Sequence, residues 1–332
     1  MLHEDCIPHR LLGRMKKERL NTALFAEELG LHLSFVYLTV EPPDKTDCVT
    51  FGHPYNQSES PFHPGCTCPM QTLTISTCMA PNMDYFARDV AEYLASRLGA
   101  RVDLRVDVPW QEREQMLDAG QLDLCWICGL PYVRKADARP GSLIPLAAPV
   151  MRAPRYQNQP IYFSDVVVRR GSPFQRLEDL LGAVWAYNEP GSHSGNGVVR
   201  YTLAVRGTSP NMFGRVIKAG SHQNALGMIV RGEVDAAAID STVLEQEMRD
   251  RPALTGQIRV IDIFGPSPIP PWVAPARLPA ELRETLRSLL MEMHTGPAGR
   301  ALLERAAVAR FAPVDDTAYA PIRAMARLAF GE

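Results

Sequence analysis

Two short turns rich in Gly, Ser and His constrain the fold of this chain most, because each lies directly before an apolar helical pattern. The first turn, residues 188–200, reads NEPGSHSGNGVVR and opens into the helix-like stretch Val198–Val205. The second, Gly220–His222, precedes the apolar residues Leu226, Ile229 and Val230. A helix start leaves backbone N–H groups free, and hydroxyl and imidazole groups beside them suit a tetrahedral oxyanion. Ser-Gly clusters also cap helices without any ligand, so the spacing alone leaves both interpretations open.

The residues that follow the second turn indicate an α/β protein. Gly232 ends the helical pattern, and Val234–Ile239 is typical of a short buried strand that ends at the polar residue Asp240. A polar turn at a helix start, fed from the end of a strand, therefore occurs twice. Such turns form ligand-binding clefts in α/β proteins.

From Leu73 onward, strand and helix patterns alternate. Apolar patterning predicts strands at residues 73–77, 102–106, 122–127, 185–187, 216–217 and 234–239. Helical spacing predicts helices at residues 85–98, 110–119, 281–294 and 298–307, the first two ending at Gly99 and Gly120. The β-α-β-α-β order at the start of this region is typical of parallel strands.

Two further strands, residues 161–168 and 258–263, are predicted to cross between two lobes. We expect lobe 1 to comprise residues 70–163 and 262–332, and lobe 2 to comprise residues 164–261. The predicted fold class is α/β, with two mixed, mostly parallel sheets joined by a two-strand hinge. The ligand would lie between the lobes.

The first 69 residues differ in composition from the rest of the chain. They hold five of the eight His and four of the seven Cys, and residues 41–69 are rich in Pro. We expect a poorly ordered N-terminal extension there, or a start-site artefact. His53, His63, Cys66 and Cys68 do not have a standard zinc-ligand spacing. A helix-turn-helix echo at residues 25–36 lacks basic residues for phosphates, and residues 1–69 carry six Lys and Arg against nine Asp and Glu.

The overall charge and hydropathy narrow the class of ligand. The formal net charge is −2, which leaves no basic excess for nucleic acid, so anion recognition must be local and the ligand small. No stretch of about 18 apolar residues predicts a membrane span. The first thirty residues are charged throughout and lack the apolar run of a signal peptide. The sequence therefore predicts either a cytosolic protein or a reading frame with a different start.

Cys125 and Cys128 form a C-x-x-C within an apolar strand pattern. A redox motif normally follows a strand and opens a helix, so we interpret these thiols as buried packing groups. The use of cysteine fits a reducing compartment.

The order of several segments resembles one family, the substrate-binding proteins of phosphonate, phosphite and phosphate ABC importers. The matching segments are residues 107–126, 162–168, 172–182, 188–200, 219–241 and 267–270, and the likeness extends from about Leu73 to the C-terminus. The resemblance implies the type 2 periplasmic-binding-protein fold, a small oxyanion ligand, no cofactor and no metal. It also implies a monomer that works in the periplasm with an ABC permease and an ATPase.

The resemblance also assigns ligand-binding residues. The family holds the phosphoryl or phosphonyl group on an S-[TS]-S turn, which here corresponds to Ser192, His193 and Ser194, and on a histidine that corresponds to His222, or to Ser221 if the turn is shifted by one residue. His193 replaces a hydroxyl and would add charge when protonated. Two aromatic walls of the family's pocket correspond to Trp110 and Tyr162.

Two positions depart from the family pattern. Members that bind aminoalkyl phosphonates hold the ammonium with acidic residues, and the nearest matches here are Thr242 and Pro271 or Trp272. A carboxylate remains only at Asp240. We therefore expect phosphate, phosphite or a phosphonate with a neutral or aromatic tail against Trp110, Tyr162 and Trp272.

Two alternatives remain open at this stage. The same fold occurs in cytosolic biosynthetic enzymes, and the missing signal sequence favours that class. No nucleophile–base pair or metal-ligand cluster is apparent from residue 70 onward, which favours a non-enzymatic binding protein. A ligand sensor is the third possibility.

Overall fold

The computed structural model describes residues 72–331, and the predicted N-terminal extension, residues 1–69, lies outside this range. The first sheet has the strand order β11-β4-β10-β3-β1-β2 and the second β7-β6-β8-β5-β9. The first contains β1 (Thr72–Thr77), β2 (Arg101–Arg105), β3 (Leu124–Trp126), β4 (Leu143–Met151), β10 (Trp272–Pro275) and β11 (Val308–Pro313). The second contains β5 (Ile161–Arg169), β6 (Val184–Tyr187), β7 (Arg215–Lys218), β8 (Ala236–Asp240) and β9 (Ile258–Pro268).

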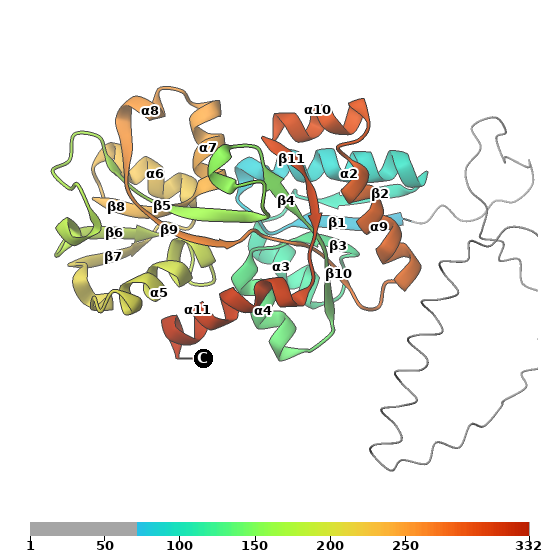
Figure 1. Ribbon diagram of the computed structural model, residues 1–332, viewed down its shortest axis with the longest axis horizontal. Helices are drawn as coiled ribbons and strands as arrows, with labels where there is room; N and C mark the ends of the chain where they lie inside the picture. Colours follow the sequence, from blue (N-terminus) through green and yellow to red (C-terminus); the bar gives the residue numbers. More distant parts are fainter. Residues whose placement is uncertain (1–71, 332) are drawn as a thin grey trace, which may run out of the picture. The chain divides into compact units, whose positions relative to one another are not determined.

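Helices flank both sheets (Figure 1). Lobe 1 carries α2 (Asp84–Leu98), α3 (Trp110–Asp118), α4 (Gly129–Ala138), α9 (Ala280–Glu292), α10 (Pro297–Arg305) and α11 (Ala320–Phe330). Lobe 2 carries α5 (Val198–Val205), α6 (His222–Arg231), α7 (Ser241–Asp250) and the single turn α8 (Leu254–Gln257). Gly99 and Gly232 end α2 and α6 in the left-handed conformation that glycine adopts without strain, which confirms both predicted helix ends.

The two crossing strands, β5 and β9, lie side by side and pair antiparallel from Ile161 and Pro268 to Arg169 and Ile258. The predicted lobe limits, 163/164 and 261/262, fall within these strands. The α/β class and the two mixed sheets are confirmed, but the expectation of mostly parallel strands is wrong. Only β1–β2, β1–β3, β6–β7 and β6–β8 are parallel, and the other five pairs are antiparallel. In the first sheet, β10 returns from lobe 2 and runs opposite to β3 and β4, and β11 also runs opposite to β4. In the second sheet, the crossing strand β5 runs opposite to both of its neighbours, β8 and β9.

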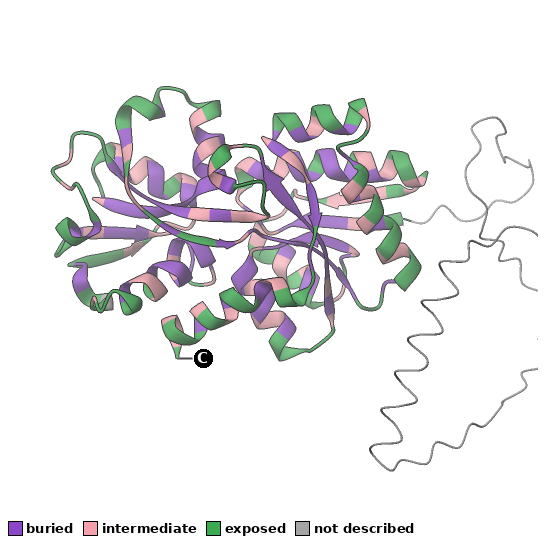
Figure 2. Ribbon diagram, viewed as in Figure 1, coloured by how far each residue is buried: buried purple, intermediate pink, exposed green. Residues whose placement is uncertain are grey.

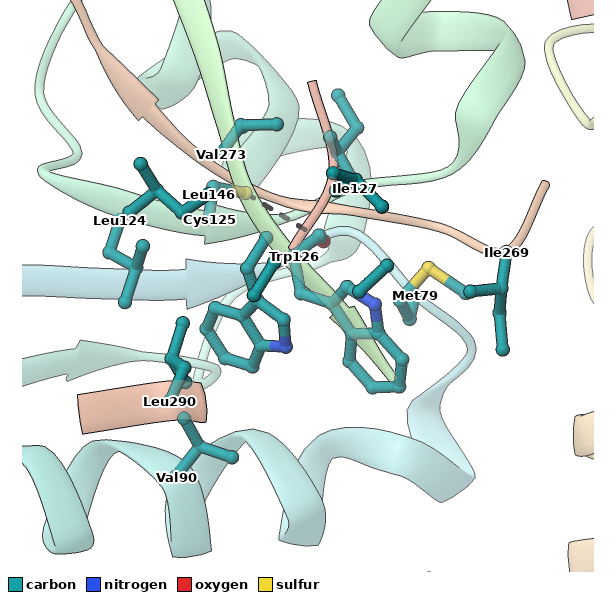
Figure 3. Packing of buried hydrophobic residues seen from close by; sticks show 14 of the residues in the cluster. Met79, Val90, Leu124, Cys125, Trp126, Ile127, Leu146, Ile269, Val273 and Leu290 are labelled. Carbon is teal, nitrogen blue, oxygen red and sulfur yellow. Dashed lines mark hydrogen bonds between the residues drawn. The ribbon is translucent and has the colours of Figure 1, made fainter. Parts of the chain in front are cut away.

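Each lobe has its own apolar core, and Figure 2 shows that the strands are mostly buried while the outer faces of the helices are exposed. In lobe 1, Trp126 stacks on Trp272 with ring centroids 5.8 Å apart. Figure 3 shows Trp126 among its neighbours, with Val90 of α2 and Leu290 of α9 together on one side of the strands. In lobe 2, the alternating residues of β5 pack on opposite faces of the sheet.

No helix within residues 72–331 has the length and apolar character needed to cross a bilayer.

Candidate functional site

A cavity of about 330 Å³ is lined by residues of both lobes. Lobe 2 contributes Asn188, Glu189, Gly191, Ser192, Ser194, Gly220, Ser221, His222, Asp240 and Val243. Lobe 1 contributes Cys78, Met79, Ala80, Pro81, Trp110, Glu114, Cys128, Pro131, Arg134 and Lys135. Both polar turns identified in the sequence thus reach the same cavity.

The first turn follows β6 and forms a short π-helical segment, His193–Gly197, directly before α5. The Ser192 hydroxyl caps this segment by accepting a hydrogen bond from the Gly195 N–H at 3.1 Å. A second bond fixes the turn to β5, because the Ser164 hydroxyl donates to the Ser194 carbonyl oxygen at 2.6 Å. The turn is therefore held by both its own cap and the crossing strand.

The second turn follows β7 and caps α6. Ser221 is the cap residue, and its hydroxyl accepts a hydrogen bond from the Asn224 N–H at 3.0 Å. The first N–H groups of α6 have no partner within the helix, as at every helix start. With ten residues, α6 is long enough to present a positive dipole end here.

The His222 ring connects the two turns. Its Nε2 lies 3.1 Å from the Ser194 hydroxyl and 3.2 Å from the Asn188 side-chain nitrogen. The Asn188 amide nitrogen can only donate, so Nε2 accepts and the ring proton lies on Nδ1. Nδ1 is buried and has no hydrogen-bond partner among the described residues. Burial lowers the pKa of His222 to about 4, so the ring is neutral at physiological pH.

Two residues assigned by resemblance, His193 and Tyr162, do not line the cavity. The His193 ring points to lobe 1 residues instead, with Nε2 2.9 Å from the Ser267 hydroxyl. Tyr162 is fully buried, and its ring centroid lies 6.4 Å from that of His193. Burial lowers the pKa of His193 to about 4, so it does not supply the positive charge considered from the sequence. Both side chains therefore lie outside the cavity, whereas Ser192 and Ser194 line it.

Trp110 and Asp240 do line the cavity. Trp110 is the first residue of α3 and is half-buried. Asp240 ends β8 and caps α7, where its Oδ1 accepts hydrogen bonds from the Thr242 N–H at 2.8 Å and the Thr242 hydroxyl at 2.7 Å. Burial raises the pKa of Asp240 to about 6. Trp272, considered from the sequence as a tail contact, is fully buried and does not line the cavity.

Four charged residues of the cavity were missed by the sequence reasoning: Glu114, Arg134, Lys135 and Glu189. Glu114 pairs with Lys135 at 3.0 Å, and Glu189 pairs with Lys218 at 2.8 Å. Glu114 lies four residues after Trp110 on the same helix, and this spacing places both on one face. The sequence spacing could therefore have predicted Glu114. Arg134 and Lys135 of α4 lie in no comparable motif.

Of the three described thiols, Cys125 is a packing group of lobe 1, whereas Cys78 and Cys128 are half-buried and line the cavity, so Cys128 is not the buried packing group that was expected. Cys125 lies in β3 and is fully buried, as predicted, with its Sγ 3.7 Å from that of Cys78. Cys128 immediately precedes α4, and burial raises its pKa to about 11, which keeps it a thiol. Residues 72–331 contain no group of three or more His, Cys, Asp or Glu side chains that could hold a metal ion.

Residues 80–319 match the family described as the periplasmic substrate-binding protein of phosphonate ABC transporters. This chain belongs to that family. The family is a transporter component and not an enzyme, so the biosynthetic-enzyme hypothesis is set aside. Its members are periplasmic proteins.

Individual relatives agree with this assignment. The chain is 25% identical over 253 residues to the phosphonates-binding periplasmic protein of Escherichia coli, covering 75% of this chain and 72% of that protein. A binding-protein component of an ABC phosphonate transporter from Pseudomonas aeruginosa superposes with a TM-score of 0.68 at 20% identity, covering 77% and 85% of the two chains. PhnD1 from Prochlorococcus marinus, in complex with methylphosphonate, superposes with a TM-score of 0.68 at 19% identity, covering 77% of this chain and 97% of that chain. The two-lobed type 2 fold is thereby confirmed.

Proposed function

We propose that this protein binds a phosphonate-, phosphite- or phosphate-like oxyanion between its two lobes. The phosphoryl oxygens contact the hydroxyls of Ser192, Ser194 and Ser221 and the backbone N–H of His222 at the start of α6. The observation that carries this proposal is that two capped helix starts meet at one wall of the cavity and are joined through the Ser194–His222 contact.

The chemistry of this wall suits an oxyanion because its donors are neutral and already oriented. The hydroxyls of Ser192 and Ser221 accept backbone N–H bonds, which leaves their own protons for a ligand. Free N–H groups and the dipole of α6 favour negative charge at the same place. Trp110 and Asp240 complete the proposed site. His193 and Tyr162 lie outside the cavity and hold the first turn in place.

Two contacts across the edge of the cleft support a mechanism in which the lobes close over the ligand. The Asn82 side chain donates to the Glu247 carboxylate at 2.9 Å, and the Tyr85 hydroxyl donates to the Gln246 side-chain oxygen at 2.9 Å. Asn82 and Tyr85 belong to lobe 1, and their partners belong to α7 of lobe 2. Such bonds form on closure and break on opening.

In this proposal the protein acts as a monomer on the periplasmic side of the membrane and delivers its ligand to an ABC permease driven by an ATPase. Family membership supports these partners and this location.

Isothermal titration calorimetry with methylphosphonate, phosphite and phosphate tests the proposed ligand class, with succinate as a dianion that lacks a phosphoryl group. We expect saturable one-to-one binding of at least one phosphorus oxyanion and none of succinate. Absence of heat with all three phosphorus ligands at millimolar concentration would overturn the proposal.

A further inference from the structure

The cavity has two chemically different walls. The wall from lobe 2 carries the hydroxyl, amide and imidazole groups described above. The wall from lobe 1 includes the apolar residues Met79, Pro81, Trp110 and Pro131 and the protonated thiol Cys128, and it also carries three charged residues, Glu114, Arg134 and Lys135. A ligand that fills this space has a polar end towards lobe 2 and an apolar end towards lobe 1.

The cavity is larger than a phosphoryl group requires. Its volume of about 330 Å³ corresponds to roughly eleven water molecules at ~30 Å³ each. Phosphate and methylphosphonate have only five non-hydrogen atoms each, so either leaves at least half of the cavity unfilled. The remaining space lies beside the apolar wall, where water gains few hydrogen bonds.

The acidic residues of the cavity are already engaged. Glu114 is bound by Lys135, Glu189 is bound by Lys218, and Asp240 accepts two hydrogen bonds from Thr242. A ligand ammonium would have to displace one of these partners and lose its own hydration beside apolar side chains. Lys135 is likewise held by Glu114 and by Asp118 at 2.6 Å, which disfavours a tail with a second negative charge.

From these walls, this volume and these ion pairs, and building on the proposed function, we propose that the ligand is a phosphonate with an uncharged apolar tail. The tail has roughly three to six carbons, alkyl or aryl, which is the volume left after the phosphonyl group is seated. It packs against Trp110, Met79 and Pro131. The protein therefore selects alkyl- and arylphosphonates over inorganic oxyanions and over phosphonates with charged tails.

Calorimetric titration of a homologous series tests this selection. The series comprises methyl-, propyl-, pentyl- and phenylphosphonate. Each buried methylene strengthens binding about fourfold, which corresponds to ~0.8 kcal/mol per CH₂ group. We expect pentylphosphonate to bind at least ~10-fold more tightly than methylphosphonate, since part of the chain stays hydrated.

Two charged-tail ligands serve as matched comparisons. Propylphosphonate and 2-aminoethylphosphonate have the same shape and differ in one terminal group, so their affinity ratio isolates the effect of the ammonium. Phosphonoacetate, whose –CH₂–COO⁻ tail is similar in size, tests the effect of a carboxylate. We expect both charged ligands to bind more weakly than propylphosphonate.

A variant ties the effect to the apolar wall. In Trp110→Ala, the ratio of pentyl- to methylphosphonate affinity falls at least ~5-fold. Gln111→Ala, at the neighbouring exposed position of α3, does not line the cavity and keeps the wild-type ratio.

The results of these titrations distinguish a failure of the apolar-tail proposal from a failure of oxyanion binding. Equal affinities for methyl- and pentylphosphonate, tightest binding of a charged-tail ligand, or an unchanged ratio in Trp110→Ala would overturn the apolar tail and leave oxyanion binding intact. Absence of binding for every phosphonate and also for phosphite and phosphate would overturn the proposed function itself.

Discussion

The side chains that are proposed to bind the anion are neutral, and both histidine rings beside them are neutral as well. His222 accepts from Asn188 and lies against Ser194, and its burial keeps the ring uncharged. His193 is also buried and neutral, 2.9 Å from the Ser267 hydroxyl. Because both rings are neutral, neither forms an ion pair with Asp240, the carboxylate that lines the same cavity.

These buried histidines predict that the protein loses stability as the pH falls. Their folded pKa of about 4 lies below the ordinary value of 6.5, so between these limits the unfolded chain binds protons that the folded chain does not. From pH 7 to 5 each histidine lowers the free energy of unfolding by about 2 kcal/mol. Asp240, with its pKa raised from 3.8 to about 6, acts in the opposite direction by about 1 kcal/mol. Urea unfolding at pH 7 and pH 5 measures the sum.

A variant isolates one of these contributions. His193→Gln keeps a hydrogen-bonding group near Ser267 but removes the titration, so its loss of stability from pH 7 to 5 is about 2 kcal/mol smaller than in wild type. An identical pH dependence in His193→Gln and wild type would show that His193 is not held neutral.

At the scale of elements, sequence patterns predicted most boundaries but not the directions of side chains. Helices expected at residues 85–98 and 110–119 are α2 and α3 within one residue at each end, because apolar periodicity and glycine ends report local structure directly. The turn at Ser192 was expected to present three consecutive side chains to a ligand. Its π-helical geometry turns Ser192 and Ser194 into the cavity and His193 out of it, which residue identity alone does not specify.

Other residues of the site could not be predicted because their positions depend on contacts between elements far apart in the sequence. Glu114 shares a helix face with Trp110, but Glu189 lines the cavity only because the first turn faces lobe 1, and no local pattern encodes that contact between lobes. Trp272 was expected near the ligand from its place in a motif, but the antiparallel insertion of β10 buries it against Trp126.

The first turn predicts a sharp dependence on one glycine. A Cβ at Gly195 would lie 1.9 Å from the Asn188 Oδ1 and 3.3 Å from the His222 Cε1, so Gly195→Ala forces Asn188 and His222 apart. We expect at least a ~10-fold loss of ligand affinity, because both side chains are set by this turn. The matched control is Gly171→Ala, where a Cβ meets no atom within 4 Å. Full affinity in Gly195→Ala would contradict the assigned role of the Asn188–His222 pair.

At the scale of the whole molecule, polar contacts of Asn82, Tyr85 and Tyr156 join lobe 1 to α7 of lobe 2. The double variant Asn82→Ala and Tyr85→Phe removes the Asn82–Glu247 and Tyr85–Gln246 hydrogen bonds, worth about 0.5–1.5 kcal/mol each, together with a longer bond from Asn82 to the Val243 carbonyl oxygen. The equilibrium between open and closed forms then shifts towards open, and ligand affinity falls by about 5- to 100-fold. Calorimetry measures the affinity, and small-angle scattering of the free protein measures the shift. Ser96→Ala, on the same helix but bonded only to Tyr93, is the control.

The N-terminal extension is predicted to be dispensable. Within the part of the chain that the structure describes, which begins at Thr72, both sheets and the cavity lining are complete without residues 1–69. A chain that begins at Met70 should therefore keep the melting temperature and the ligand affinity of the full chain. A melting temperature several degrees lower would show that residues 1–69 are part of the folded unit.

The central claim is that the oxyanion binds at the Ser192–Ser194 turn, and calorimetry on the double variant Ser192→Ala and Ser194→Ala tests it most directly. Two lost hydrogen bonds to a charged ligand are worth about 1.5–3 kcal/mol each, so the Kd for methylphosphonate should rise at least ~100-fold. The Ser209 hydroxyl accepts a hydrogen bond from the Asn211 N–H at 3.1 Å and does not line the cavity. The control variant Ser209→Ala should therefore bind methylphosphonate as tightly as wild type. A folded double variant whose Kd stays within about threefold of wild type would contradict the account, since the anion would then be held elsewhere.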